Sequence, residues 1–222
     1  MTKKAKKKTV KRLATKPSVA GLYAITPDLA DTNELLRKVQ LALQGGARVL
    51  QYRNKIADAA LQLQQASALR HLTREFNTTF IVNDDAALAA EVDADGVHLG
   101  GEDGSVAAAR AVLGESKLIG VSCYNRAPLA LAAVQQGADY VAFGAFFPSS
   151  VKPEAVKADV SMLREARHEI HLPIVAIGGI TQQNGAELIQ AGADSLAVIS
   201  ALWDAPDIEA SARGFSYLFE KK

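Results

Sequence analysis

Eight short apolar segments recur along this chain, with a helix-like segment after each of them. The apolar segments are rich in β-branched and aromatic residues, which is typical of buried strands. The predicted strands begin at Gly21, Arg48, Phe80, Gly96, Leu118, Tyr140, Pro173 and Ser195. So regular an alternation of strands and helices in about 200 residues predicts a single-domain (β/α)₈ TIM barrel.

The segments between the predicted strands carry apolar residues at helical spacing or are rich in alanine. The predicted helices cover residues 33–43, 59–76, 86–92, 106–113, 129–136, 161–170, 184–190 and 207–219. Glycine–alanine pairs at residues 46–47, 137–138 and 192–193 each stand between a helix and a strand, where glycine commonly ends a helix. A doubly wound open sheet is the alternative fold, and eight evenly spaced strands without its glycine fingerprint favour the barrel.

The two ends of the chain differ in charge. The net charge of +1 includes eight lysines and arginines within residues 1–16, so the remaining residues carry a net charge of −7. We expect residues 1–18 to form a disordered basic tail and residues 19–222 to form the barrel domain. A nucleic-acid tether and an organelle-targeting arm are the alternatives for the tail, and a solvated tail without a nucleic-acid partner is preferred.

Other features of the sequence indicate where in the cell the protein is expected. No apolar run reaches the length that spans a membrane, and residues 1–20 lack the apolar core of a secretory signal. The single cysteine, Cys123, excludes an internal disulfide and is consistent with a reducing cytoplasm. The sequence therefore predicts a cytoplasmic protein without a membrane partner, and it leaves a homo-oligomer open.

In a barrel, functional side chains lie at the carboxyl ends of the strands. The second predicted strand runs into Gln51, Arg53 and Lys55, whose alternation places them on one side of an extended segment. Two cations and an amide at a strand end suit a phosphate or a diphosphate. A solvated loop with salt bridges is the alternative interpretation.

Acidic residues follow the third predicted strand, which runs into Asn83, Asp84 and Asp85. One interpretation is a polar strand end in which Asp85 caps the next helix. The other is a hard-metal site, since Mg²⁺ binds one or two carboxylates together with substrate phosphates. Both interpretations stay open at this point.

Later strand ends offer hydrogen-bond donors. Ser122 ends the fifth strand, where its hydroxyl either binds a ligand or bonds to nearby backbone, and no histidine–aspartate relay is expected beside it. His98 is predicted to be a packed, hydrogen-bonded barrel residue rather than a base. The loop after the sixth strand carries Ser149, Ser150 and Lys152. Glycines after the seventh strand and backbone amides after the eighth predict a phosphate cradle.

Several motifs occur in a fixed order along the chain: QYRNK, VNDD, DGVHLGGED, IGVS, GAFFPSSVK, AIGGI and AGADSLAVIS. This ordered set resembles the thiamine-phosphate synthase family, also called thiamine-phosphate pyrophosphorylase, from Leu22 to the last helix. The resemblance implies a Mg²⁺-dependent transferase that joins an aminopyrimidine methyl diphosphate to a thiazole phosphate. It also implies a dissociative reaction that releases diphosphate, which agrees with the absence of any expected nucleophile–base pair.

The resemblance implies roles for individual residues. Mg²⁺ would be held by Asp84 and Asp103. Catalysis would involve Arg53, Lys55, Ser122 and Lys152. The pyrimidine diphosphate would contact Gln51, Arg53, Lys55, Asn83, Ser122 and Lys152, with Tyr52 and Asn54 in the same segment as the first three. The thiazole phosphate would contact Ser149, Ser150, Gly179, Ile199 and Ser200, with Val151 in the first loop.

Two positions depart from the family pattern. Gly101 stands where the family usually has glutamine, and Val151 stands where it usually has a second threonine. Two alternatives therefore remain: a thiazole tautomerase-like isomerase of the same fold that uses a histidine base, and a non-catalytic binder of thiamine-pathway phosphates. The synthase is favoured by the joint presence of Gln51, Arg53, Lys55, Asp84, Asp103 and Lys152.

Overall fold

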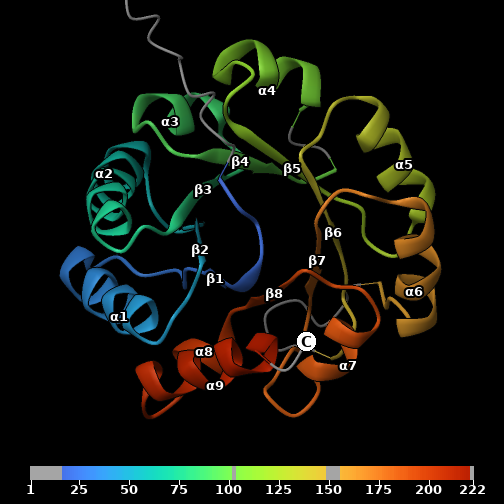
Figure 1. Ribbon diagram of the computed structural model, residues 1–222. Helices are drawn as coiled ribbons and strands as arrows, with labels where there is room; N and C mark the ends of the chain where they lie inside the picture. The colour runs from blue at the N-terminus through green and yellow to red at the C-terminus, as the bar shows by residue number, and fades with distance from the viewer. Residues whose placement is uncertain (1–16, 102–103, 149–155, 221–222) are drawn as a thin grey trace, which may run out of the picture.

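The protein folds into a closed barrel of parallel strands surrounded by helices (Figure 1). The computed structural model describes residues 17–101, 104–148 and 156–220. The strands follow one another around the barrel in sequence order, and the first pairs with the last. The predicted (β/α)₈ TIM barrel is therefore confirmed, and the open sheet is excluded.

The strands begin at their predicted starts or one residue away from them. They are β1 (Gly21–Ile25), β2 (Val49–Tyr52), β3 (Thr79–Asn83), β4 (Gly96–Leu99), β5 (Leu118–Ser122), β6 (Tyr140–Phe143), β7 (Ile174–Ile177) and β8 (Ser195–Val198). In the parallel register Asn83 lies beside His98, and Ser122 lies beside Ala142. The pairing thus brings polar residues of several strands to the same level of the barrel.

The helices are α1 (Thr32–Gln44), α2 (Ala59–Glu75), α3 (Ala86–Glu91), α4 (Val106–Leu113), α5 (Ala127–Gln135), α6 (Val160–Glu169), α7 (Gly185–Gln190), α8 (Ser200–Trp203) and α9 (Ile208–Glu220). Eight of them match predicted helices. The sequence did not predict α8, because four residues are too few to show a helical period. Among the helices in the described part of the chain, none is long and apolar enough to cross a membrane.

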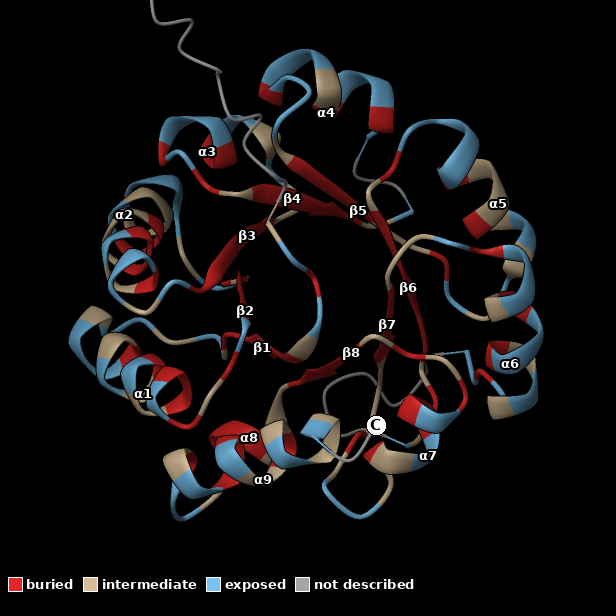
Figure 2. Ribbon diagram, viewed as in Figure 1, coloured by how far each residue is buried: buried red, intermediate tan, exposed pale blue. Residues whose placement is uncertain are grey.

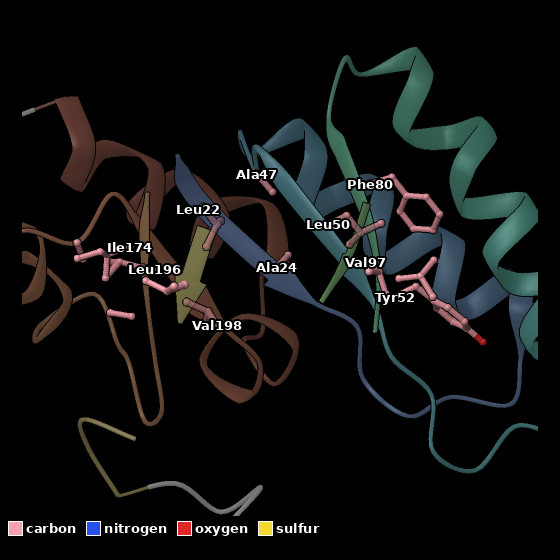
Figure 3. Packing of buried hydrophobic residues seen from close by; sticks show 14 of the residues in the cluster. Leu22, Ala24, Ala47, Leu50, Tyr52, Phe80, Val97, Ile174, Leu196 and Val198 are labelled. Carbon is pink, nitrogen blue, oxygen red and sulfur yellow. The ribbon is translucent and has the colours of Figure 1, made fainter. Parts of the chain in front are cut away.

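Alternate residues of each strand face opposite sides of the barrel wall. In β1, Leu22 and Ala24 pack in the layer between the barrel and the helices, whereas Tyr23 and Ile25 pack in the barrel interior. Figure 3 shows part of the layer between barrel and helices, and Figure 2 shows that the strands are buried while the outer faces of the helices are exposed. This alternation decides which polar residues enter the barrel.

A repeated ion pair holds the amino-terminal end of the barrel, and we call its three copies the arginine–aspartate clamps. An arginine of α2, α4 or α6 binds an aspartate that immediately precedes β4, β6 or β8. The pairs are Arg70–Asp95, Arg110–Asp139 and Arg167–Asp194, with N–O distances of 2.9, 2.7 and 2.9 Å. In each clamp the aspartate also accepts a hydrogen bond, of 2.8–2.9 Å, from the backbone N–H at or near the start of the preceding strand.

The glycine–alanine pairs lie in the turns at the same end of the barrel, between a helix and the next strand. Gly46, Gly137 and Gly192 have φ angles of 98°, 87° and 112°, which favour glycine. Asp93 occupies the equivalent turn before β4 with a φ of 51°, so the fourth copy does not show as a glycine in the sequence. In the first copy, Arg48 stands where the other three have the clamp aspartate.

Candidate active site

A cavity of about 560 Å³ opens at the carboxyl ends of the barrel strands. Its walls are largely apolar, and polar groups enter from strand ends that lie far apart in the sequence. The predicted site residues that line it are Gln51, Arg53, Asn83, Ser122, Gly179, Ile199 and Ser200. The fold thus brings together candidates from β2, β3, β5 and the segments after β7 and β8.

The strand alternation separates the residues of the QYRNK segment. Gln51 is turned into the barrel, whereas the Tyr52 hydroxyl donates to Gln65 Oε1 of α2 at 2.9 Å. Asn54 Nδ2 also donates to Gln65 Oε1, at 2.9 Å. Lys55 is exposed and does not line the cavity. The structure therefore does not bring Tyr52, Asn54 or Lys55 to the cavity wall.

Arg53 is held by two residues that the sequence did not single out. Thr26 Oγ1 lies 2.8 Å from both the backbone N and the carbonyl O of Arg53. Arg53 Nη1 lies 3.3 Å from Asp28 Oδ1, which also accepts the Lys55 backbone N–H at 2.8 Å. Thr26 ends the first predicted strand and Asp28 follows it. These positions could have identified both residues as site candidates, because all strand ends meet at this face.

The two interpretations of the acidic segment after β3 apply to different residues. Asp85 Oδ1 accepts the Leu88 N–H at 2.9 Å and caps α3, so the capping interpretation is confirmed for Asp85. Asp84 has a φ of 63°, which is uncommon for a residue other than glycine. Its carboxylate accepts a hydrogen bond from the Asn83 amide, and its backbone N–H donates to the His98 carbonyl at 2.8 Å.

The donor atoms beside β3 fit a hard cation that the substrate helps to bind. Asp84 offers a carboxylate, and Asn83 keeps its amide oxygen available because its Nδ2 is the atom that bonds to Asp84. Within residues 17–101, 104–148 and 156–220, no group of three or more His, Cys, Asp or Glu side chains could hold a metal ion. Asp103, the second implied ligand, lies outside the described residues. Phosphate oxygens would therefore have to supply part of the coordination of Mg²⁺.

His98 is confirmed as a packed and hydrogen-bonded barrel residue. Its Nδ1 lies 3.1 Å from the Tyr140 hydroxyl, and its ring stacks on Tyr140 with centroids 5.5 Å apart. Its Nε2 lies 2.9 Å from Ser122 Oγ, a contact that we did not expect and that arises because β4 pairs with β5. In the relay of a serine hydrolase Nδ1 would contact a carboxylate, whereas here Nδ1 contacts the Tyr140 phenol.

Two tyrosines continue this hydrogen-bonded set across the barrel interior. The hydroxyls of Tyr23 and Tyr140 lie 3.0 Å apart, and Gln51 Nε2 donates to the Tyr23 hydroxyl at 2.9 Å. Burial raises the pKa of both tyrosines far above the ordinary value, so both hydroxyls keep their protons. No local sequence pattern predicts this contact, since the two tyrosines are 117 positions apart.

The glycines after β7 are required by the close approach of another loop. Gly178 and Gly179 have φ angles of 102° and 61°. A Cβ on Gly179 would lie 2.3 Å from the Pro148 carbonyl oxygen, and Phe147 N–H donates to the Gly178 carbonyl at 3.0 Å. The loop after β6 therefore lies against this side of the cavity. The further predicted residues of that loop lie outside the described residues: Ser149, Ser150, Val151 and Lys152.

A tyrosine occupies the space beside Gly101, one of the two departures from the family pattern. Gly101 N–H donates to the Tyr124 hydroxyl at 3.2 Å, and a Cβ on Gly101 would lie 2.8 Å from that oxygen. Tyr124 has a φ of 52° and lines the cavity. In this chain an aromatic side chain from the segment after β5 thus takes space that a larger residue at position 101 would need.

Comparison with known proteins places the chain in a family. The family described as thiamine monophosphate synthase matches residues 22–202. A thiamine-phosphate synthase of Methylobacillus flagellatus is 58% identical over 203 residues, which cover 91% of this chain and 97% of that protein. A thiamine-phosphate synthase of Thiobacillus denitrificans is 53% identical over 199 residues, covering 90% and 94%.

A solved structure agrees with these relatives. The thiamine phosphate pyrophosphorylase from Pyrococcus furiosus superposes with a TM-score of 0.82 at 35% identity, covering 91% of this chain and 96% of that one. The family match spans all eight strands that surround the cavity. This chain is therefore an enzyme, a transferase, and it belongs to the thiamine-phosphate synthase family.

Proposed function

We propose that the protein joins an aminopyrimidine methyl diphosphate to a thiazole phosphate and releases diphosphate. The observation that carries this proposal is that two groups of candidate anion-binding residues line one cavity. Gln51, Arg53 and Ser122 enter it from β2 and β5, whereas Gly179 and Ser200 enter from the segments after β7 and β8. Two phosphorylated substrates need two such regions, and a shared cavity brings their reacting atoms together.

Arg53 is the described cation best placed to bind the diphosphate. It lines the cavity, and its pairing with Asp28 at 3.3 Å is looser than a charge-assisted hydrogen bond of about 2.8 Å. The guanidinium can therefore turn toward a diphosphate without losing a strong internal bond. Lys55 and Lys152, the other implied cations, stay predictions, as do the contacts implied for Tyr52 and Asn54.

In a dissociative reaction the bond from the pyrimidine methylene to diphosphate breaks before the thiazole nitrogen forms the new bond. The leaving group then needs stabilisation of negative charge, and the methylene needs protection from water. Arg53 supplies positive charge, and the apolar side chains of Ala142, Val175 and Ala197 line the same cavity. No protein nucleophile is required by this sequence of bond changes.

Asp84 and Asp103 would hold Mg²⁺ at the end of β3 and in the segment after β4. When bound there, the ion would neutralise part of the diphosphate charge. Asn83, which donates to Asp84, would keep that carboxylate oriented.

Diphosphate release tests the proposal directly. The purified chain is mixed with both phosphorylated substrates, with Mg²⁺ or with a chelator in excess, and diphosphate is followed with a coupled assay. We expect release only when both substrates and Mg²⁺ are present. Release that does not depend on the thiazole phosphate, or that persists in the chelator, would contradict the proposed reaction or its metal requirement, respectively.

The isomerase alternative is favoured by one observation, the His98 ring in the cavity wall. A tautomerase-like activity would convert a thiazole phosphate without Mg²⁺ and without a diphosphate substrate. Proton exchange into the thiazole, followed by NMR in deuterated buffer, would show it. A non-catalytic binder would instead give heats of binding for both phosphates in calorimetry and no product.

A further inference from the structure

Five side chains form a continuous hydrogen-bonded chain through the barrel interior. Gln51 bonds to Tyr23, Tyr23 to Tyr140, Tyr140 to His98, and His98 to Ser122, with successive distances of 2.9, 3.0, 3.1 and 2.9 Å. The members come from β2, β1, β6, β4 and β5. Both end residues line the cavity, whereas Tyr140 does not line it and is fully buried. Tyr140 therefore connects two parts of the cavity wall from beneath.

The direction of the donors follows from counting protons. Gln51 Nε2 has no lone pair, so it donates to the Tyr23 oxygen. If Tyr23 donates to the Tyr140 oxygen and Tyr140 donates to His98 Nδ1, every proton of the set has an acceptor. In the reverse arrangement the Tyr23 proton would have no acceptor among the described residues, because its other neighbour, Gln51 Nε2, is itself a donor. Because Nδ1 accepts, a neutral His98 carries its proton on Nε2 and donates it to Ser122 Oγ. The Ser122 proton is then left to point into the cavity.

We propose that Tyr140 is a positioning residue whose hydroxyl holds His98 as the Nε2–H tautomer and thereby makes Ser122 a hydrogen-bond donor to the bound substrate. At the other end, the same direction leaves Gln51 Oε1 as an acceptor at the cavity wall. The ligand that fits has an acceptor facing Ser122 and a donor facing Gln51. The identification of that ligand as the aminopyrimidine diphosphate rests on the proposed function.

The absence of a side chain at Gly120 leaves the space that the Tyr140 ring occupies. A Cβ on Gly120 of β5 would lie 2.0 Å from Cζ of the Tyr140 ring. Only glycine at that inward position lets the ring cross from β6 toward His98. The Tyr140 hydroxyl could not otherwise reach both of its partners, so the placement of the ring is built into two neighbouring strands.

The first test reads the tautomer of His98 and needs no turnover. Nitrogen-15 chemical shifts of the histidine rings distinguish protonated from unprotonated ring nitrogens, and loss of one signal set in His98→Gln identifies His98. We expect Nε2–H with an unprotonated Nδ1 in the wild-type chain, and a mixture of tautomers in Tyr140→Phe. A proton on Nδ1 in the wild type would reverse the chain of donors and overturn the proposal.

The second test is a double-mutant cycle on the affinity for the pyrimidine diphosphate, measured by calorimetry with Mg²⁺ and without the thiazole phosphate. We expect Ser122→Ala and Tyr140→Phe each to weaken binding, by about tenfold and about fivefold, as expected for lost hydrogen bonds. The double variant should lose little more than Ser122→Ala alone, because Tyr140 acts through Ser122.

Ser195→Ala is the matched control for this cycle. Ser195 is fully buried on β8, and its hydroxyl donates to the Gly21 carbonyl at the other end of the barrel. It should not change the affinity, alone or with Ser122→Ala. The proposal is wrong if Tyr140→Phe leaves the affinity unchanged, as the control does. It is also wrong if the fold-losses in affinity of Tyr140→Phe and Ser122→Ala multiply in the double variant, because Tyr140 would then have only a packing role. Binding with the expected coupling but no diphosphate release would refute the proposed reaction and leave the positioning role standing.

Discussion

The two ends of the barrel use arginine and aspartate differently. At the amino-terminal end, Arg70 binds Asp95 through two parallel hydrogen bonds of 2.9 and 3.0 Å. At the cavity end, one nitrogen of Arg53 lies 3.3 and 3.4 Å from the two oxygens of Asp28. The first pair is bidentate, although the buried Nε of Arg70 has no hydrogen-bond partner within the described part of the chain. The second pair uses only Nη1 of Arg53 and leaves the other guanidinium donors unused by that partner.

This difference indicates that the clamps stabilise the fold, whereas the polar groups at the cavity end are arranged to bind a ligand. A clamp aspartate joins a helix to the starts of two strands, and its charge is neutralised within the protein. At the cavity end, polar groups are held in place by neighbours yet keep donors and acceptors for a ligand. The three arginine–aspartate clamps therefore lie at the end of the barrel opposite the cavity, where functional residues are not expected.

The largest expected effect is at the cavity end. If Asp84 holds Mg²⁺ as proposed, Asp84→Asn should lower kcat on the order of 10³-fold, since loss of that carboxylate would remove several kcal/mol of charge stabilisation. Asparagine tolerates the positive φ at this position, so the melting temperature should hardly change.

Asp85→Ala is the matched control for Asp84→Asn. It should cost about 1 kcal/mol of unfolding free energy through the lost helix cap and leave kcat unchanged. Steady-state kinetics and urea unfolding on both variants check the contrast. Full activity in Asp84→Asn would remove the metal assignment.

The opposite result is expected at the amino-terminal end. Asp95→Ala leaves the buried Arg70 without its partner and should cost about 3–5 kcal/mol of unfolding free energy. Asp93 lies 3.9 Å from Arg70 and can take up part of that charge, which favours the lower value. Michaelis constants should stay unchanged.

Asp194→Ala tests whether a more exposed clamp contributes less to stability than the Arg70–Asp95 clamp. The Arg167–Asp194 pair is about 30% exposed, so its loss should cost less, about 1–2 kcal/mol. Urea unfolding of Asp95→Ala and Asp194→Ala shows which of the two loses more unfolding free energy. A larger cost for Asp194→Ala, or a change in substrate affinity in either variant, would contradict the division between the two ends.

A smaller effect, on the pH dependence of stability, is expected from Cys123, the neighbour of Ser122 at the cavity end. Ser122 faces the cavity, whereas Cys123 is buried between the barrel and the helices, and burial raises the pKa of its thiol to about 12. The unfolded chain loses this proton above about pH 8.5, while the folded protein keeps it. Stability should therefore fall as the pH rises, by about 2 kcal/mol between pH 8 and pH 10.

Cys123→Ala should remove most of that pH dependence, whatever its effect on stability at pH 8. Urea unfolding at the two pH values measures it. The tyrosines of the interior act in the same direction but begin to matter only near pH 10, because that is the pKa of an unfolded tyrosine. Equal slopes in wild type and variant would show that the thiol is accessible in the folded protein.

The smallest effect is expected from the basic tail. Removal of residues 1–16 should leave kcat and the melting temperature unchanged, since this segment is mostly polar and cationic in sequence. Thermal unfolding and steady-state kinetics of the shortened chain measure both. A clear drop in either would show that the tail contributes to one of the two ends.

Much of this architecture follows from local patterns in the sequence. Strand and helix spacing predicted the barrel, because each unit carries its own apolar period and turn residues. The same period of two explains why Gln51 enters the cavity while Tyr52 turns to α2, a distinction that the resemblance to relatives did not make. Asp85 as a helix cap was likewise readable from the segment itself.

Contacts between distant segments were decided only by strand pairing and by closure of the barrel. Closure sets Tyr23 of β1 against Tyr140 of β6. The pairing of neighbouring strands places His98 beside Ser122 and brings Asp28 to Arg53. No local pattern encodes these pairs, because their energy comes from burial and register across strands rather than from neighbours in the chain. The sequence by itself determined which residues stand at strand ends; the tertiary structure decided which of them share a hydrogen bond.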